Sequence, residues 1–387
     1  MDISRYVANV VNNADAARDA SRVKNLSVVA TLLGPAVRGL VLQQGKQGAQ
    51  THMPASHAAA FTWQYRRDQP EMAKLYAAAK TSQWDPDQVL DWKTSVDFHD
   101  PDHSLMEDAL LPLSELPAHQ ALNKHKQAEH RAGLVAWMLS QFLHGEQGAL
   151  FAACQVTESV GWFDGKLYGA TQVMDEGRHV EVFNRYLQEK MGRVYAINDN
   201  LFVIIDALMR GSDWDLKFLG MQIMIEGLAL GAFGSMRAGT REPLLRELLK
   251  YVITDEARHV HYGVVALREH YLHDVSEKVR RDREDWAFEM ALLLRNRFLA
   301  HEFYEEFYAQ SLTRKEWDAF ILNSKFMKLF RSTMFRRIVP NLKRIGLMSE
   351  RIRPHYQAIG LLDWEHEKAA PELTAQELVD VELPKAS

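Results

Sequence analysis

One short pattern of residues occurs twice in this chain, and its residue types are those that bind metal ions. Each copy reads Asp-Glu-x-Arg-His-Val, and the copies lie eighty positions apart. Glutamate and histidine three positions apart share one face of a helix. A further glutamate, in an apolar stretch, precedes the glutamate of each copy by thirty positions. The six candidate ligands are Glu146, Glu176, His179, Glu226, Glu256 and His259.

The spacing of these residues requires the chain to reverse direction twice. A straight helix of thirty residues would separate its ends by roughly 45 Å. The midpoint of the first interval is Gly161, within a stretch that has glycines suited to a break. The midpoint of the second is Arg241, between Gly239 and Pro243, where Thr240 could be the N-cap of the next helix. The sequence therefore predicts two antiparallel helical hairpins that bring the six side chains to one level, in a four-helix bundle.

The surroundings of the two single glutamates favour a metal site. Glu146 and Glu226 lie among small and apolar residues, where an unpaired carboxylate would either be neutral or need a cation. The alternative, that these are ordinary residues of helix surfaces, does not account for two matched copies. Carboxylates and imidazoles without thiolates favour iron or manganese over zinc. We predict a dinuclear centre of two iron ions, with a Mn/Fe pair as the alternative.

The aspartate and the arginine of each copy have a predicted role beside the metal ligands. A histidine that binds a metal usually donates its other ring N–H to a carboxylate, which fixes its tautomer and orientation. We predict that Asp175 and Asp255 each accept this hydrogen bond from the histidine of the other copy. Arg178 and Arg258 would then hold the aspartates. The alternative is that these four charged side chains face solvent.

Bulk composition restricts the class of protein. The chain has 387 residues, of which 47% are hydrophobic and 25% charged, with a net charge of −5. This balance gives no general attraction to nucleic acid or to an anionic membrane. A single cysteine, Cys154, permits no internal disulfide and fits a cytoplasmic location. The start of the chain lacks the pattern of a signal peptide. The apolar stretch 28–42 is interrupted by glycine, proline and arginine, so we expect no membrane span.

The predicted fold class is all-α, a ferritin-like four-helix bundle with additional N- and C-terminal helices. Few stretches alternate with period two, so almost no sheet is expected. The predicted division is an N-terminal helical extension (1–120), the bundle (121–275), C-terminal helices of the same domain (276–365) and a loose tail (366–387). The expected helices cover 61–79, 122–159, 165–191, 201–209, 213–238, 242–272, 283–310 and 314–338, and Asp85 and Asp213 are expected to cap helices.

The ligand pattern resembles that of the ferritin-like di-iron carboxylate superfamily, and in particular the ribonucleotide-reductase-like oxygenases. The resemblance covers about residues 130–280. It implies an enzyme that uses two metal ions and O₂ to oxidise a small or medium organic molecule, by hydroxylation or N-oxygenation. Glu176 and Glu256 would bridge the metals. A desaturase, epoxidase or oxidase is the alternative within enzymes, and an iron-storage or structural bundle is the alternative outside them.

Departures from the named subfamilies concern residues near the ligands. Phe183 stands where radical-generating reductase subunits have tyrosine. Leu230 stands where monooxygenases have threonine. Val252 stands where some arylamine N-oxygenases have a third histidine. A substrate pocket could be lined by Ala149, Cys154, Phe183, Leu230 and Phe233. Cys154 could equally be a small core residue, and the Gly/Ala-rich positions beside the ligands could open a cavity or allow close helix packing.

The expected partners follow from what the sequence contains and lacks. It has no flavin or nicotinamide fingerprint, so electrons would come from a separate reductase or ferredoxin. The substrate is expected to be a small organic molecule rather than a nucleic acid. A two-fold homodimer is the default expectation.

Overall fold

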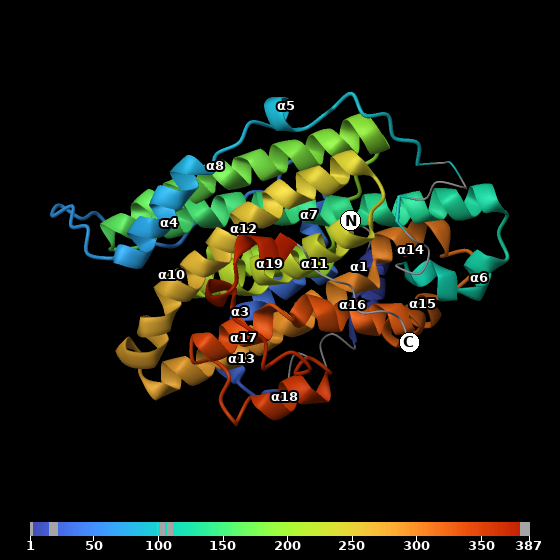
Figure 1. Ribbon diagram of the computed structural model, residues 1–387. Coiled ribbons are helices and arrows are strands. Elements are labelled where there is room, and N and C mark those ends of the chain that lie inside the picture. The colour runs from blue at the N-terminus through green and yellow to red at the C-terminus, as the bar shows by residue number, and fades with distance from the viewer. Residues whose placement is uncertain (1–2, 15–21, 99, 101–104, 107–110, 380–387) are drawn as a thin grey trace.

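The computed structural model describes residues 3–14, 22–98, 100, 105–106 and 111–379. In this part of the chain the secondary structure is helical, and the one β-type pairing is an isolated bridge between Met106 and Thr240. The predicted all-α class is therefore confirmed. Long helices run roughly parallel or antiparallel through the middle of the molecule, and shorter ones cover them (Figure 1).

Four helices form the bundle: α7 (Lys124–Ser159), α8 (Phe163–Tyr186), α11 (Glu226–Gly239) and α12 (Pro243–Glu269). They pair as two hairpins, α7 with α8 and α11 with α12, as the two predicted reversals require. The first reversal occupies three residues around Gly161, between Ser159 and Phe163. Helices α8 and α12 each end in a π-helical turn, η5 (Leu187–Met191) and η7 (His270–Asp274).

The second reversal is built differently from the prediction. Thr240 is not the N-cap of α12, because it follows the last residue of α11 in extended conformation. The N-cap is Glu242, whose carboxylate accepts hydrogen bonds from the backbone N–H groups of Leu244 (2.8 Å) and Leu245 (2.6 Å). Pro243 explains why Glu242 is the N-cap. Proline fits the first position of a helix, so the cap is the residue directly before it.

The third bundle helix has the expected extent but is less regular than expected. It begins as α10 (Trp214–Phe218), continues as the π-helical segment η6 (Leu219–Ile225) and becomes α11 at Glu226. Asp213 stands at its N-cap position but caps nothing, because its carboxylate pairs with Arg283 at 2.9 Å. π-Helical segments are rare and are frequent at functional sites, and this one ends directly before a candidate ligand.

Small residues on α11 allow close helix packing. A Cβ atom at Gly231 would lie 2.8 Å from the Cα atom and 3.0 Å from the carbonyl oxygen of Met334, on α16 (Lys325–Phe335). At Gly227 the nearest atom would be 3.6 Å away. Gly231 therefore allows α11 and α16 to pack closely. Close helix packing was one of the two interpretations of the small residues, and an open cavity was the other.

The N-terminal segments cover two sides of the bundle. Helix α4 (Pro70–Thr81) lies against α8, and α3 (Leu26–Ala36) lies against α9 (Asp199–Arg210). The predicted helix 61–79 is wrong in its first half, because residues 51–69 form no helix and α4 begins at Pro70. Asp85 caps α5 (Pro86–Val89) as predicted, accepting a hydrogen bond from the N–H of Asp87 at 2.9 Å.

The two long C-terminal helices expected at 283–310 and 314–338 are each broken. The first divides into α13 (Glu277–Asn296) and α14 (His301–Phe307), with the turn η8 (Arg297–Leu299) and Ala300 at φ +49° between them. The second divides into α15 (Arg314–Asn323) and α16, where Ser324 caps the new helix. Helix α17 (Ile338–Arg344) follows.

The predicted loose tail is wrong for its described part. The short helix α19 (Ala375–Val379) packs against α12, and the side chains of Leu378 and Val379 are buried there. Residues 380–387 lie outside the described part of the chain. The remaining helices and turns are α1 (Ile3–Asn12), η1 (Val37–Val41), η2 (Gln44–Lys46), η4 (Pro112–Glu115), α6 (Pro117–Gln120), α18 (Arg353–Ala358) and η9 (Ala370–Glu372).

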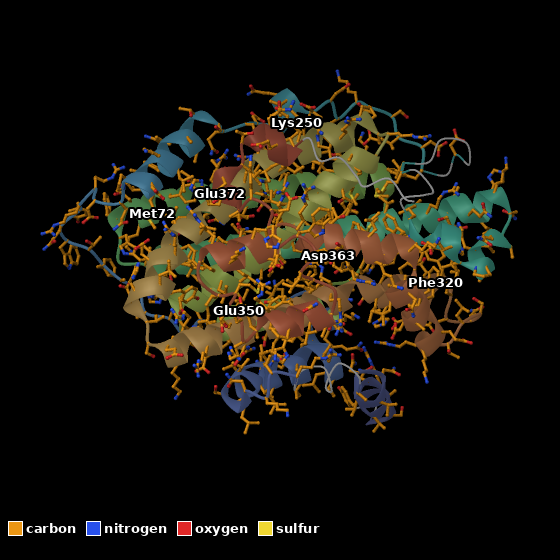
Figure 2. All side chains as sticks on the ribbon, turned by 60° about the horizontal axis from the view of Figure 1, so that its bottom comes forward. Met72, Lys250, Phe320, Glu350, Asp363 and Glu372 are labelled. Carbon is orange, nitrogen blue, oxygen red and sulfur yellow. The ribbon has the colours of Figure 1, made fainter. Side chains whose placement is uncertain are left out.

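Two helical stretches of the described residues are long and apolar enough to cross a membrane. Residues 214–239 are such a stretch, but 89% of its apolar window is buried, as in the core helix of a bundle. Residues 26–46 are the other, with 22% buried. Within this second stretch, Arg38 forms a 2.6 Å ion pair with Asp206 of α9. Figure 2 shows the blue N-terminal helices along one edge of the molecule, beside the C-terminal helices. Asn25 joins them by donating to Asp282 and Asp285, each at 2.8 Å.

A buried pair of histidines predicts acid sensitivity. His119 and His130 approach the hydroxyl of Tyr308 with Nδ1 at 3.1 and 2.9 Å. Burial, together with the neighbouring His130 and Arg131, lowers the pKa of His119 to about 4. The folded protein therefore binds fewer protons than the unfolded chain, so this contribution to stability is complete above pH 6.5 and declines as the pH falls toward 4.

The measurement is the free energy of unfolding of the metal-free protein between pH 4 and pH 8, by denaturant titration. His119→Gln should flatten the acid decline relative to the unsubstituted protein. His125→Gln, at an exposed position of α7, is the matched control and should leave the curve unchanged. Parallel curves for His119→Gln and the unsubstituted protein would contradict the assignment.

Candidate metal centre

The six predicted ligands converge from the four bundle helices into two overlapping groups. Within each group, one donor atom per residue lies within 4.8 Å of the others. Glu176 and Glu256 belong to both groups, and each of the six residues is at most 5% exposed. The first group is Glu146, Glu176, His179 and Glu256, and the second is Glu176, Glu226, Glu256 and His259.

The distances between donor atoms suit ligands of a common cation. Nδ1 of His179 lies 3.2 Å from Glu146 Oε2 and 3.1 Å from Glu256 Oε1, and Nδ1 of His259 lies 3.0 Å from Glu176 Oε1. Two ligands about 2.1 Å from one ion, at right angles, are roughly 3 Å apart. Both oxygens of Glu256 and Oε2 of Glu176 and Glu226 accept no hydrogen bond. Buried carboxylate oxygens without partners are costly, so this donor set fits a pair of metal ions.

Without cations, the close approach of the buried carboxylates and imidazoles changes their pKa values. Burial, and then the nearby carboxylate of Glu256, raises the pKa of Glu146 and of Glu226 well above the usual value for a glutamate. Burial by itself would lower the pKa of His259, but Glu176 and Glu256 outweigh it, so that pKa lies well above its usual value. Protons thus carry the positive charge in the metal-free cluster, and metal ions would displace them.

The aspartates contact the histidines across the two copies of the motif. Nε2 of His179 lies 3.1 Å from Asp255 Oδ2, and Nε2 of His259 lies 3.3 Å from Asp175 Oδ2. These contacts leave Nδ1 of each histidine facing the glutamates. The guanidinium of Arg178 donates to Asp175 (2.5 Å) and to Asp255 (3.0 Å). Arg258 also pairs with both aspartates. All four side chains lie away from solvent, so the surface interpretation of these residues is wrong.

Three polar residues of the site were not found from the sequence. Gln172 donates to Glu176 Oε1 (3.2 Å) and to Glu226 Oε1 (3.0 Å). It lies one turn before Glu176 on α8, a spacing that could have indicated it. Gln83 donates to Asp175 (3.0 Å), and the indole N–H of Trp84 donates to Asp255 (2.8 Å). These two lie between α4 and α5, and no spacing in the sequence relates them to the motif.

A small cavity of about 20 Å³, enough for about one water molecule, adjoins the glutamates. Of the five residues predicted for a pocket, Ala149 and Phe233 line it. Phe183 is fully buried beside Phe233, with ring centroids 5.7 Å apart, and Leu230 is buried in the core. Cys154 is partly exposed and does not belong to the lining. The other lining residues are Gln141, Phe142, Gly145, Glu146, Ile225, Glu226, Ala229, Glu256 and Arg297.

Comparison with known proteins gives only distant likenesses. No family model and no curated protein matches the chain. Among solved structures, an R2-like ligand-binding oxidase with aerobically reconstituted Mn/Fe cofactor aligns with a TM-score of 0.46 and 17% identity, over 76% of this chain and 99% of its own. A point mutant of an R2-like ligand-binding oxidase aligns with a TM-score of 0.48 and 17% identity, over 72% and 94%. At these values we draw nothing from the likeness about the site or its reaction.

The contact between His179 and Asp255 gives a prediction about metal affinity. Asp255→Asn should weaken metal binding by about 10- to 100-fold, because an amide neither fixes the tautomer of His179 nor balances the two arginines. Competition with a chelator of known affinity measures the change. Asp274→Asn, at an exposed position after α12, is the control and should bind metal normally. Equal affinities for Asp255→Asn and the unsubstituted protein would contradict the role.

Proposed function

We propose that this protein is an oxidoreductase with a dinuclear metal centre that activates O₂ to oxidise a small or medium organic molecule, by hydroxylation or N-oxygenation. One observation supports the proposal most strongly. Four glutamates and two histidines are buried at the centre of the bundle, in two groups that share Glu176 and Glu256. Such a shared pair of carboxylates suits two adjacent ions better than one.

Each side chain of the site has a proposed task. Glu146 and His179 would hold one ion, Glu226 and His259 the other, and the two shared glutamates would lie between them. The bound ions would supply the electrons that reduce O₂. Gln172 restrains a shared and a terminal carboxylate through its hydrogen bonds. The rings of Phe142 and Phe233 meet edge to face at 4.8 Å, and both residues line the cavity beside the glutamates.

The proposal includes partners that the chain itself does not provide. Electrons would come from a separate reductase or ferredoxin, and two iron ions are the expected metal content, with Mn/Fe as the alternative. A cytoplasmic location and a homodimer remain predictions from the sequence.

The test is metal loading followed by exposure to O₂. Protein loaded anaerobically with Fe²⁺ should contain about two ions per chain, the number that the ligand set suits. The reduced, loaded protein should consume O₂ rapidly, and Glu176→Ala should bind less metal and consume none above buffer. Elemental analysis of protein produced with both manganese and iron identifies the native pair.

Three outcomes would contradict the proposal. Metal content near zero would remove the centre. Two bound ions without O₂ consumption would favour a structural role. Uptake of many iron atoms per chain would favour storage.

A further inference from the structure

A larger cavity lies outside the metal centre. It has a volume of about 240 Å³, the space of roughly eight water molecules, and its walls come from α3, α9, α10 and α13. None of the six metal ligands belongs to its lining. The side chains of Arg38 and Arg210 in its wall are 25% and 28% exposed, so the cavity is open to solvent beside two cations.

The two arginines share a single carboxylate. Arg38 donates from Nε (2.9 Å) and from Nη2 (2.6 Å) to Oδ2 of Asp206, and Arg210 donates from Nε to Oδ1 at 2.7 Å. Asp206 is fully buried, so it holds both guanidinium groups from the protein side. Nη1 of Arg38 and both terminal nitrogens of Arg210 donate to none of the described residues. These donors are therefore available to a ligand.

A third cation in the wall is the buried side chain of Lys217, which is 1% exposed. Its ammonium donates to Oε1 of Gln155 (2.6 Å) and to the carbonyl oxygen of Leu208 (2.8 Å), which are both neutral acceptors. Burial lowers the pKa of Lys217 to about 8, so the group is still mostly charged at neutral pH. Lysine is rarely buried to this degree without a partner of opposite charge. One of its three N–H donors has no acceptor among the described residues.

The nearby carboxylates do not balance these cations. Asp213 also lines the cavity, but it pairs with Arg283 at 2.9 Å, and Arg283 pairs with Asp215 at 2.7 Å. Four cationic and three anionic side chains thus make up the network, and one positive charge is left over. The cations are Arg38, Arg210, Lys217 and Arg283, and the anions are Asp206, Asp213 and Asp215. A ligand that completes this network is anionic.

We propose that this cavity binds a small organic phosphate, whose phosphate group is held by Arg38, Arg210 and Lys217. The three cations come from three different helices, α3, α9 and α10. Donors that approach from three sides suit a tetrahedral group with three free oxygens better than a planar carboxylate with two. Pro35, Leu216 and Trp286 give the cavity an apolar wall for the organic part. The site is separate from the metal centre and does not rest on the proposed function.

The test is calorimetric titration of the full-length protein in a buffer free of phosphate. Phenyl phosphate should bind at least about tenfold more tightly than phenol, the preference expected of charge-assisted hydrogen bonds, and more tightly than benzoate. Inorganic phosphate should bind more weakly than phenyl phosphate, because it leaves the apolar wall without a contact. These four probes need no variant of the protein.

Variants of the wall identify where the phosphate binds. Arg210→Gln should weaken the binding of phenyl phosphate by about 10- to 100-fold, and Asp206 would keep Arg38 as its partner. Asp213→Asn should tighten the binding, because it removes a negative charge from the lining. Arg246→Gln, at an exposed position of α12, is the matched control and should bind phenyl phosphate normally.

Each contrary result would overturn the inference. Equal affinities for phenyl phosphate and phenol would remove the anion site, and equal affinities for phenyl phosphate and benzoate would remove the selection of phosphate. Inorganic phosphate that binds as tightly as phenyl phosphate would rule out the organic ester. Unchanged affinity in Arg210→Gln, shown to be folded by circular dichroism, would place the phosphate elsewhere. Metal content, measured on the same samples, tests the proposed function independently.

Discussion

Replacing Glu256 by alanine is expected to lower the metal content from about two ions per chain to near zero, because this carboxylate belongs to both ligand groups. Glu226→Ala removes a ligand from one group only, so it should retain about one ion. Elemental analysis after loading with Fe²⁺ measures both. The difference in metal content between the two variants identifies Glu256 as a shared ligand. Loss of metal in one variant alone would not distinguish a shared ligand from a ligand of one ion.

The same substitution should alter the coupling between metal and stability. Ligands that bind only the folded state stabilise it, by about 2.7 kcal/mol at a concentration of 100 times Kd. Added Fe²⁺ should therefore raise the melting temperature of the unsubstituted protein and leave that of Glu256→Ala unchanged. Glu181→Ala, at an exposed position of α8, is the control and should respond to metal normally. Full metal content in Glu256→Ala would refute the ligand set.

Gly231→Ala is expected to destabilise the fold, although alanine is the better helix former. The new methyl group would lie 2.8 Å from the Cα atom of Met334, so α16 would have to move away from α11. Overpacking of this kind costs about 1–3 kcal/mol. Alanine gains only about 1 kcal/mol over glycine in helix propensity, so the net effect should be a loss of stability. The free energy of unfolding from denaturant titration should fall.

Gly177→Ala is the matched comparison, with the opposite sign. A Cβ atom at Gly177, also within a bundle helix, meets nothing within 4 Å. The second copy of the motif already has Ala257 at this position. The substitution should raise the free energy of unfolding by about 0.5–1 kcal/mol. A loss of stability for Gly177→Ala, or a gain for Gly231→Ala, would show that the packing between α11 and α16 is not the reason for the glycine.

The sequence predicted the bundle because its signals are local. Glu-x-x-His places two ligands on one face of a helix, and the thirty-residue intervals centre on Gly161 and Arg241, where the chain does reverse. Where the prediction of a boundary failed, a second local signal competed with the first. Glu242 rather than Thr240 caps α12 because Pro243 follows it, and α4 starts at Pro70 for a similar reason.

Breaks and irregular turns of helices were not predictable in this way. Nothing near Ala300 marks a break, yet the residue adopts φ +49° between α13 and α14. Helix α16 begins after Ser324 partly because Glu115, 209 positions earlier, accepts hydrogen bonds from the Ser324 hydroxyl and from the N–H of Phe326. The π-helical segment before Glu226 likewise has no mark in the sequence. Such features depend on packing partners rather than on the residues themselves.

The sequence by itself determined which residues could bind metal, because residue type and helical spacing fix both the donor atoms and their common face. It also indicated that Asp175 and Asp255 could reach across to the opposite histidines. Only the tertiary structure decided what surrounds that set. Trp84 reaches Asp255 from a segment 171 positions away. Arg297, just after the end of α13, lines the same cavity as Glu146, Glu226 and Glu256, and its burial depends on neighbours that are distant along the chain.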